Sequence, residues 1–175
     1  KELLSIGIQP HVVVCRTELE IPEDMKRKIS MFCNVREEDI IQNMTAPSLY
    51  EVPMMLENEG LTDSVCHHLG LENREPDLTE WTAMTQRQHN ADKDVTIGLV
   101  GKYVALQDAY LSVAEALHHG GIVNDARVKI LWIDSEKITR ETAPEMLKEC
   151  DGIIVPGGFG DRGIEGKITA IEFAR

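Results

Sequence analysis

Three short apolar runs alternate with two helical stretches in the second half of the chain, and this alternation limits the fold more than any other feature. The runs cover residues 95–101, 128–133 and 152–156. Short runs this rich in apolar residues are typical of strands in a parallel sheet that helices cover on both faces. Strand–helix–strand units with short connections cross over with right-handed topology. The sequence therefore predicts a parallel α/β sheet covered by helices on both faces.

Helix signals lie between these strands. Asp108 is placed to cap the first helix, which would carry Val113 and Leu117 on one face and end at the pair Gly120 and Gly121. A second, short helix is expected over residues 143–150. In a sheet of this kind a ligand binds beyond the carboxyl ends of the strands.

The first half of the chain shows the same alternation more weakly. Residues 11–15 predict a central, buried parallel strand, and residues 39–41 a further short strand. Pro22 is placed at the first turn of a helix that runs to about Cys33. A second helical segment would open at Pro47, be weakened or kinked by Pro53 and stop at Gly60. The apolar residues of the first helix would form one face: Met25, Ile29 and Phe32.

A polar stretch separates the two halves. Apolar residues become sparse between about residues 70 and 94, so we place the parts of the chain at residues 1–72 and 94–175 with a linker over 73–93. Leu78, Trp81 and Met84 recur at helical spacing, which predicts a helix within the linker that is docked by Trp81.

Charge and hydropathy exclude several classes of protein. The chain has 18 Lys and Arg against 30 Asp and Glu, and the net charge of -12 argues against binding to nucleic acid or to an anionic membrane. No apolar run reaches the ~18 residues of a membrane span, and the start resembles no signal peptide. We expect a cytoplasmic protein. The chain begins at Lys1 and ends within an apolar helix, so we expect a piece of something longer.

The four cysteines are scattered and form no C-x-x-C pair, which predicts buried free thiols rather than a zinc site or a disulfide framework. Cys150 with the pair His118 and His119 is the only local material for a thiol nucleophile and its base. A packing role for Cys150 is the stronger interpretation, because it directly precedes a strand. We expect no metal site, since adjacent histidines diverge around a helix.

A glycine-rich segment, PGGFGDRG at residues 156–163, follows the third strand. At a strand's carboxyl end such glycines can aim consecutive N–H groups at one point, which suits an anion or a developing oxyanion. A tight strand-to-helix turn explains the same glycines. The segment does not match the dinucleotide fingerprint G-x-G-x-x-G with its later acidic residue. It is not a P-loop either, because Ile168 and not a hydroxyl residue comes directly after Lys167. Arg16 and Lys28 follow the first strand, where either a ligand or solvent would meet them.

Six motifs resemble the CTP synthase family, in order and over nearly the whole chain. They are IGIQP at 6–10, VCR at 14–16, MFCNV at 31–35, GKY at 101–103, DAY at 108–110 and VPGGFG at 155–160. The resemblance implies an α/β fold with parallel doubly wound sheets. Residues 1–72 would be the end of a P-loop-type synthetase domain, and residues 94–175 the first half of a flavodoxin-like class I glutamine amidotransferase domain.

The resemblance also implies a function. A protein of this family aminates UTP to CTP with ATP and Mg2+, using ammonia from glutamine, in pyrimidine nucleotide biosynthesis. GTP would be the allosteric activator, CTP the feedback inhibitor and a homotetramer the assembly. The motif positions imply these roles: an oxyanion hole from the N–H groups of Gly157, Gly158 and Phe159; glutamine binding at Gly158; UTP or CTP binding at Lys28; ATP binding at Arg16, Met44, Thr45 and Ala46; and the GTP site near Phe159 and Gly166.

The chain also lacks parts of the family pattern. It contains neither the P-loop and magnesium carboxylates nor the elbow that carries the catalytic Cys, with its His and Glu partners. We therefore expect this piece alone to be inactive. Two other functions remain open: a non-catalytic α/β module that binds an anion or nucleotide at residues 157–160, and an amidotransferase of another pathway, for which the second half would suffice.

Overall fold

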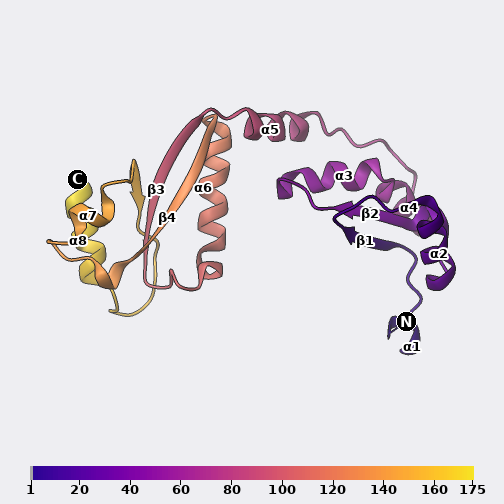
Figure 1. Cartoon of the computed structure of the whole chain (residues 1–175), viewed down its shortest axis with the longest axis horizontal. Helices are drawn as coiled ribbons and strands as arrows, with labels where there is room; N and C mark the ends of the chain where they lie inside the picture. Colours follow the sequence, from indigo (N-terminus) through magenta and orange to yellow (C-terminus); the bar gives the residue numbers. More distant parts are fainter. Residues whose placement is uncertain (1) are drawn as a thin grey trace. The chain divides into compact units, whose positions relative to one another are not determined.

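The computed structural model describes residues 2–175, which form two compact units, residues 2–85 and 86–175 (Figure 1). Both units are α/β with parallel strands, which confirms the predicted fold class. No helix within residues 2–175 has the length and apolar character needed to cross a bilayer.

The first unit has a two-stranded parallel sheet in which Val13 of β1 pairs with Ile40 of β2. The two predicted strands are confirmed, with the first lying two residues later than expected. The elements are α1 (Glu2–Ser5), β1 (Val13–Thr17), α2 (Glu23–Cys33), η1 (Glu37–Asp39), β2 (Ile40–Met44), η2 (Leu49–Glu51), α3 (Val52–Asn58) and α4 (Leu61–Leu69).

The predicted burial of β1 was wrong. Half-buried and exposed residues alternate along β1, and the side chain of Val14 is 49% exposed. Within residues 2–175, β1 has a hydrogen-bonded neighbour on one side only, so it is not a central strand. The expected apolar face of α2 is also uncovered at Met25 and Phe32. The core of this unit lies instead on β2, where Ile40 and Ile41 are almost fully buried.

Proline and glycine positions set the helix boundaries of this unit. Pro22 immediately precedes α2, one position before the first turn in which it was predicted. Pro53 does not kink a helix; it lies in the first turn of α3, where a missing N–H costs nothing. Gly60 has φ of +82° and ends α3, but α4 begins at the next residue. The sequence interpretation missed α4.

A buried carboxylate, Asp39, ties α4 to the start of β2. Arg36 donates Nε and Nη2 to its two oxygens at 2.8 and 2.9 Å. The Ser64 hydroxyl of α4 donates to the same group, and His68 Nε2 lies 3.0 Å from it. Chiefly through the Arg36 hydrogen bonds, which outweigh burial, the pKa of Asp39 is held well below its usual range.

The low pKa of Asp39 predicts acid-sensitive stability. A lowered folded-state pKa contributes stability that is complete above the unfolded value of about 4 and is lost as the pH falls toward the folded value. Asp39→Asn should lower the free energy of unfolding at pH 7 by about 1–3 kcal/mol and reduce its dependence on pH between 5 and 3. Urea titrations across this range would measure both effects.

Asp24→Asn is the matched control, because Asp24 pairs with Lys28 on the exposed surface of α2. It should leave the pH dependence as in the unchanged chain. An equal pH dependence in Asp39→Asn and the unchanged chain would contradict the assignment.

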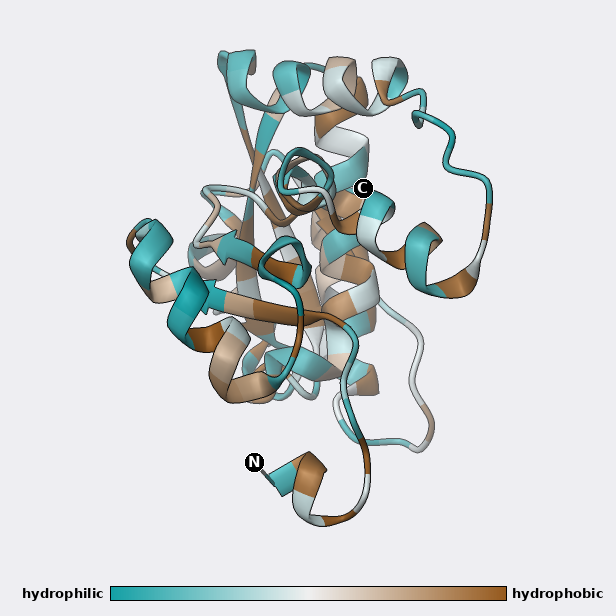
Figure 2. Cartoon of the chain, turned by 90° about the vertical axis from the view of Figure 1, so that its right-hand side faces the viewer, coloured by the Kyte–Doolittle hydropathy of each residue, from teal (hydrophilic) through white to brown (hydrophobic). Residues whose placement is uncertain are grey.

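The predicted helix in the linker is α5 (Thr79–Asn90). Trp81 docks it as expected, donating its indole N–H to the carbonyl of Tyr50 at 2.6 Å. The segment between α4 and α5 is mainly hydrophilic from residue 72 to residue 77 (Figure 2) and contains no helix or strand.

The second unit is a parallel sheet in the order β4-β3-β5, so that Ile97 of β3 lies between Ile130 and Gly152. Figure 1 shows α6 on one side of the sheet and α7 and α8 on the other, which confirms the predicted covering of both faces. The elements are β3 (Lys93–Gly101), η3 (Gln107–Tyr110), α6 (Leu111–Val123), β4 (Ala126–Asp134), η4 (Ser135–Lys137), α7 (Ala143–Leu147), β5 (Gly152–Ile154) and α8 (Ile164–Ala174).

Two predicted boundaries of α6 were wrong. Asp108 is not its cap, because residues 107–110 form a 3-10 turn before α6 begins at Leu111. Gly120 and Gly121 do not end the helix, which continues to Val123. Gly121 serves close packing instead, since a Cβ there would lie 2.6 Å from the carbonyl oxygen of Ala126.

Candidate functional site

The glycine-rich segment lies where the sequence predicted it, at the carboxyl end of β5 and beside the end of β3. Residues 155–163 connect β5 to α8. Gly160 and Gly163 adopt φ of +78° and +74°, a conformation that costs other residues strain. We call residues 156–160 the glycine loop.

The glycine loop presents unused hydrogen-bond donors. Gly157, Gly158 and Phe159 are exposed, and the Phe159 side chain is 99% exposed. Within residues 2–175, no acceptor receives a hydrogen bond from the N–H groups of these three residues. Three consecutive backbone donors are therefore available to a ligand, as an oxyanion hole requires.

Two lysines hold carbonyl groups of the glycine loop. Lys167 of α8 donates its ammonium to the Pro156 oxygen at 2.9 Å, and Lys102, after β3, donates to the Phe159 oxygen. A trans peptide directs its C=O and N–H oppositely, so the Lys167 bond also sets the direction of the Gly157 N–H. A Cβ on Gly158 would lie 3.3 Å from Lys102 Cε and 3.8 Å from Lys167 Nζ. The donors thus lie next to two positive charges.

Arg162, which follows the glycine loop, connects this part of the chain to the end of β3. It donates Nη2 to the Lys102 carbonyl at 3.0 Å, and its Nε lies 2.8 Å from Glu136 Oε1. Its guanidinium is 5.2 Å from the Tyr103 ring centre, a distance suited to a cation–π contact. The sequence analysis assigned no role in this site to Lys102, Arg162 or Lys167. The usable signal was a glycine run flanked by basic residues.

Gly166 does not share a surface with Phe159. It is buried in α8, and a Cβ there would overlap the carbonyl oxygen of Ser135 in η4. The absence of a side chain at Gly166 is explained by this close approach of α8 to η4.

Cys150 is a packing residue, as interpreted from the sequence. It packs against the core of the second unit, and its Sγ would lie 2.7 Å from a Cβ on Gly98. Burial raises the pKa of the Cys150 thiol, and the charges of Asp151 and Glu149 raise it further. A nucleophilic thiol needs the opposite shift. All four cysteines are free.

In the first unit, the residues expected near ATP meet at one edge of the sheet. Thr17 pairs with Met44 across the sheet, next to Arg16, and Thr45 N–H continues the ladder to the Thr17 oxygen at 3.0 Å. Arg16 and Met44 are exposed, and Ala46 follows directly. Lys28 lies apart on α2, where its ammonium pairs with Asp24 at 3.1 Å.

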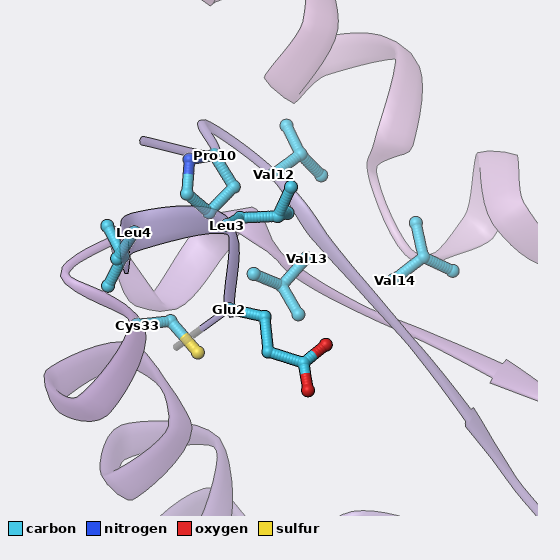
Figure 3. Close-up of a pocket in the computed structure, with 8 residues that line it drawn as sticks. All are labelled: Glu2, Leu3, Leu4, Pro10, Val12, Val13, Val14 and Cys33. Atoms are coloured by element: carbon cyan, nitrogen blue, oxygen red, sulfur yellow. The ribbon is translucent and has the colours of Figure 1, made fainter. Parts of the chain in front are cut away.

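An apolar hollow of about 630 Å³ borders β1 (Figure 3). Its single charged lining group is a carboxylate, so it is unsuited to the phosphates of a nucleotide. Among residues 2–175 no group of three His, Cys, Asp or Glu side chains could hold a metal ion. The hollow is lined by Glu2, Leu3, Leu4, Pro10, Val12, Val13, Val14 and Cys33.

Sequence comparison matches each half of the chain to a different family profile. Residues 1–71 match the profile described as CTP synthase N-terminus, and residues 105–175 match glutamine amidotransferase class-I. Curated relatives include the CTP synthases of Ruminiclostridium cellulolyticum, 63% identical over 175 residues, and Symbiobacterium thermophilum, 58% identical over 179 residues. All of this chain aligns with each of them, and it spans 33% of their length.

A solved structure of the Trypanosoma brucei CTPS glutaminase domain with bound acivicin is 43% identical to the chain. The similarity covers 46% of this chain and 32% of that one, with a TM-score of 0.42.

Proposed function

We propose that this chain joins the synthetase and amidotransferase parts of a glutamine-dependent CTP synthase. The chain belongs to the CTP synthase family and spans a third of the length of its curated relatives. One observation carries the proposal: a synthetase match and an amidotransferase match follow each other in one chain that aligns from end to end. The longer enzyme would be an ATP-dependent carbon–nitrogen ligase that aminates UTP to CTP. The synthetase match argues against an amidotransferase of another pathway.

The glycine loop would stabilise the transition state of glutamine hydrolysis. When a nucleophile attacks the glutamine amide, the carbonyl oxygen takes up negative charge. The free N–H groups of Gly157, Gly158 and Phe159 could donate to this oxygen, with Gly158 also contacting the bound glutamine. Each such donor contributes about 2.7–4 kcal/mol to comparable reactions. The nucleophile would come from another part of the longer enzyme, because Cys150 is packed and poorly acidic.

The edge of the first sheet would contribute to the ATP site. The pairing of Thr17 with Met44 supports a shared contact of Arg16, Met44, Thr45 and Ala46 with the adenine end of ATP. The exposed ammonium of Lys28 would bind UTP or CTP after exchanging its Asp24 partner for phosphate. The magnesium ligands would lie in other parts of the longer enzyme.

Regulation and assembly are part of the same proposal. The exposed Phe159 ring offers a stacking surface for the GTP base, whereas Gly166 could contribute through packing alone. CTP would inhibit the enzyme by feedback, and the enzyme would be a cytoplasmic homotetramer. The boundaries 1–72, 73–93 and 94–175 are supported by the hydrophilic segment before α5 (Figure 2).

The 175-residue chain alone is expected to hydrolyse no glutamine. It contains the proposed oxyanion donors but not an activated thiol, so a glutaminase assay should show no ammonia release above that of its Gly158→Pro variant. The longer enzyme should form CTP from UTP, ATP, Mg2+ and glutamine. Glutamine hydrolysis by the isolated chain, or a longer enzyme that forms no CTP, would contradict the proposal.

A second candidate is a non-catalytic anion-binding module, favoured by the three free N–H groups beside Lys102 and Lys167. Calorimetric titrations of the chain with glutamine and with inorganic phosphate distinguish the two. Binding of phosphate with no glutamine turnover by the longer enzyme would favour the module.

A further inference from the structure

The buried hydroxyl of Tyr110 joins the start of α6 to the end of β3. Tyr110 is 5% exposed, and its hydroxyl oxygen accepts the backbone N–H groups of Lys102 at 3.1 Å and Tyr103 at 3.4 Å. Gly101 leaves the space for this approach, because a Cβ there would lie 2.5 Å from the hydroxyl oxygen. The phenol thus holds the main chain at the point where β3 leaves the sheet.

Lys102 carries this constraint to the glycine loop. Tyr110 holds the backbone N–H of Lys102. The carbonyl of Lys102 accepts a hydrogen bond from Arg162, and its ammonium donates one to the Phe159 carbonyl. Because C=O and N–H lie in one peptide plane, the bond from Lys102 fixes the plane between Phe159 and Gly160. That plane adjoins the Phe159 N–H, one of the three proposed oxyanion donors.

We propose that Tyr110 is a positioning residue for the oxyanion donors of the glycine loop, and that it acts through Lys102. The inference rests on the proposed function of that loop. Donors that stabilise a transition state must be held in place before the reaction, since small misplacements cost large factors in rate. Tyr110 supplies such a support from outside the glycine loop.

A purely structural role of Tyr110 predicts a different result. Its ring packs near the rings of Tyr103 and Trp132, at centroid distances of 6.4 and 6.5 Å. Tyr110→Phe keeps this packing and removes the hydroxyl alone. The variant therefore separates the positioning role from the contribution of the ring.

The kinetic test uses the longer enzyme. Tyr110→Phe should lower kcat for glutamine hydrolysis about tenfold, with little change in the KM for glutamine and in CTP formation from added ammonia. Tyr103→Phe is the matched control: it removes a hydroxyl from an exposed ring of the same segment and should stay within about twofold of the unchanged enzyme. An unchanged kcat in Tyr110→Phe, or an equal loss of the ammonia-dependent rate, would overturn the proposal.

A second measurement separates this inference from the proposed function. NMR relaxation of the 175-residue chain reports the backbone order of Gly158, Phe159 and Gly160 without any catalysis. Tyr110→Phe should lower these order parameters while leaving those of α6 unchanged. Unchanged order in the glycine loop would overturn the positioning role. If the unchanged longer enzyme has no glutaminase activity but Tyr110→Phe still lowers the order of the glycine loop, the proposed function is wrong and the structural effect of Tyr110 remains.

Discussion

Replacing Gly158 by proline in the longer enzyme is expected to lower glutamine hydrolysis at least about a hundredfold. Proline removes the N–H group that would face the oxyanion. Its ring also needs space beside Lys102, whose Cε lies 3.3 Å from the position of a Cβ on residue 158. CTP formation from added ammonia should persist, because that reaction bypasses the glycine loop. Parallel assays with glutamine and with ammonia would measure the two rates.

Gly157→Ala is the matched control for this prediction. A Cβ on Gly157 would have no atom within 4 Å, and alanine keeps the backbone N–H. The variant should retain most of the glutamine-dependent rate. Equal losses in the two variants, or an equal loss of the ammonia-dependent rate in Gly158→Pro, would contradict a donor role for the Gly158 N–H.

Replacing Gly166 by alanine is expected to lower the free energy of unfolding more than Asp39→Asn does. The added Cβ would overlap the Ser135 carbonyl oxygen and lie 3.3 Å from that of Ile138. Both are backbone atoms that a rotamer change cannot move, so α8 must shift away from η4. We expect the free energy of unfolding of the second unit to fall by about 3 kcal/mol or more. Urea denaturation of the 175-residue chain would measure it.

Gly120→Ala makes the same chemical change in another helix. A Cβ on Gly120 points into open space within α6, and alanine favours the helix by about 1 kcal/mol over glycine. This variant should be as stable as the unchanged chain or more so. If Gly166→Ala is as stable as Gly120→Ala, the close packing of α8 on η4 is wrong.

The sequence predicted the second unit well because helices cover both faces of its sheet, and because β3, the central strand, is buried from residue 98 to residue 101. Residues 95–101 and 128–133 are rich in apolar residues for this reason, and both lie in paired strands. β1 was misjudged because the same apolar, β-branched signal lies in a strand with one neighbour and exposed alternate residues. Gly121 was misjudged for a different reason: its close approach to Ala126 belongs to the tertiary packing and leaves no local signal.

The candidate site was predicted in part. Strand-end glycines show where an oxyanion loop can form, since their conformational freedom is a local property. The hydrogen bonds of Lys102 and Arg162 could not be predicted from the sequence because they join residues that are far apart in it. Lys102 bonds Phe159 across 57 positions, and Arg162 bonds Lys102 across 60. The Tyr110 hydroxyl was missed because tyrosine at that position also suits a core residue.

The exposed apolar residues of the first unit have a consequence for the colloidal behaviour of the chain. Leu19, Met31 and Phe32 are between 72% and 80% exposed, and such surface draws molecules together at short range. The net charge of -12 opposes this attraction by a repulsion of longer range. Because salt shortens that range to about 10 Å at 0.1 M, the balance shifts toward self-association as the ionic strength rises. Dilute, low-salt solutions are where this chain should remain dispersed.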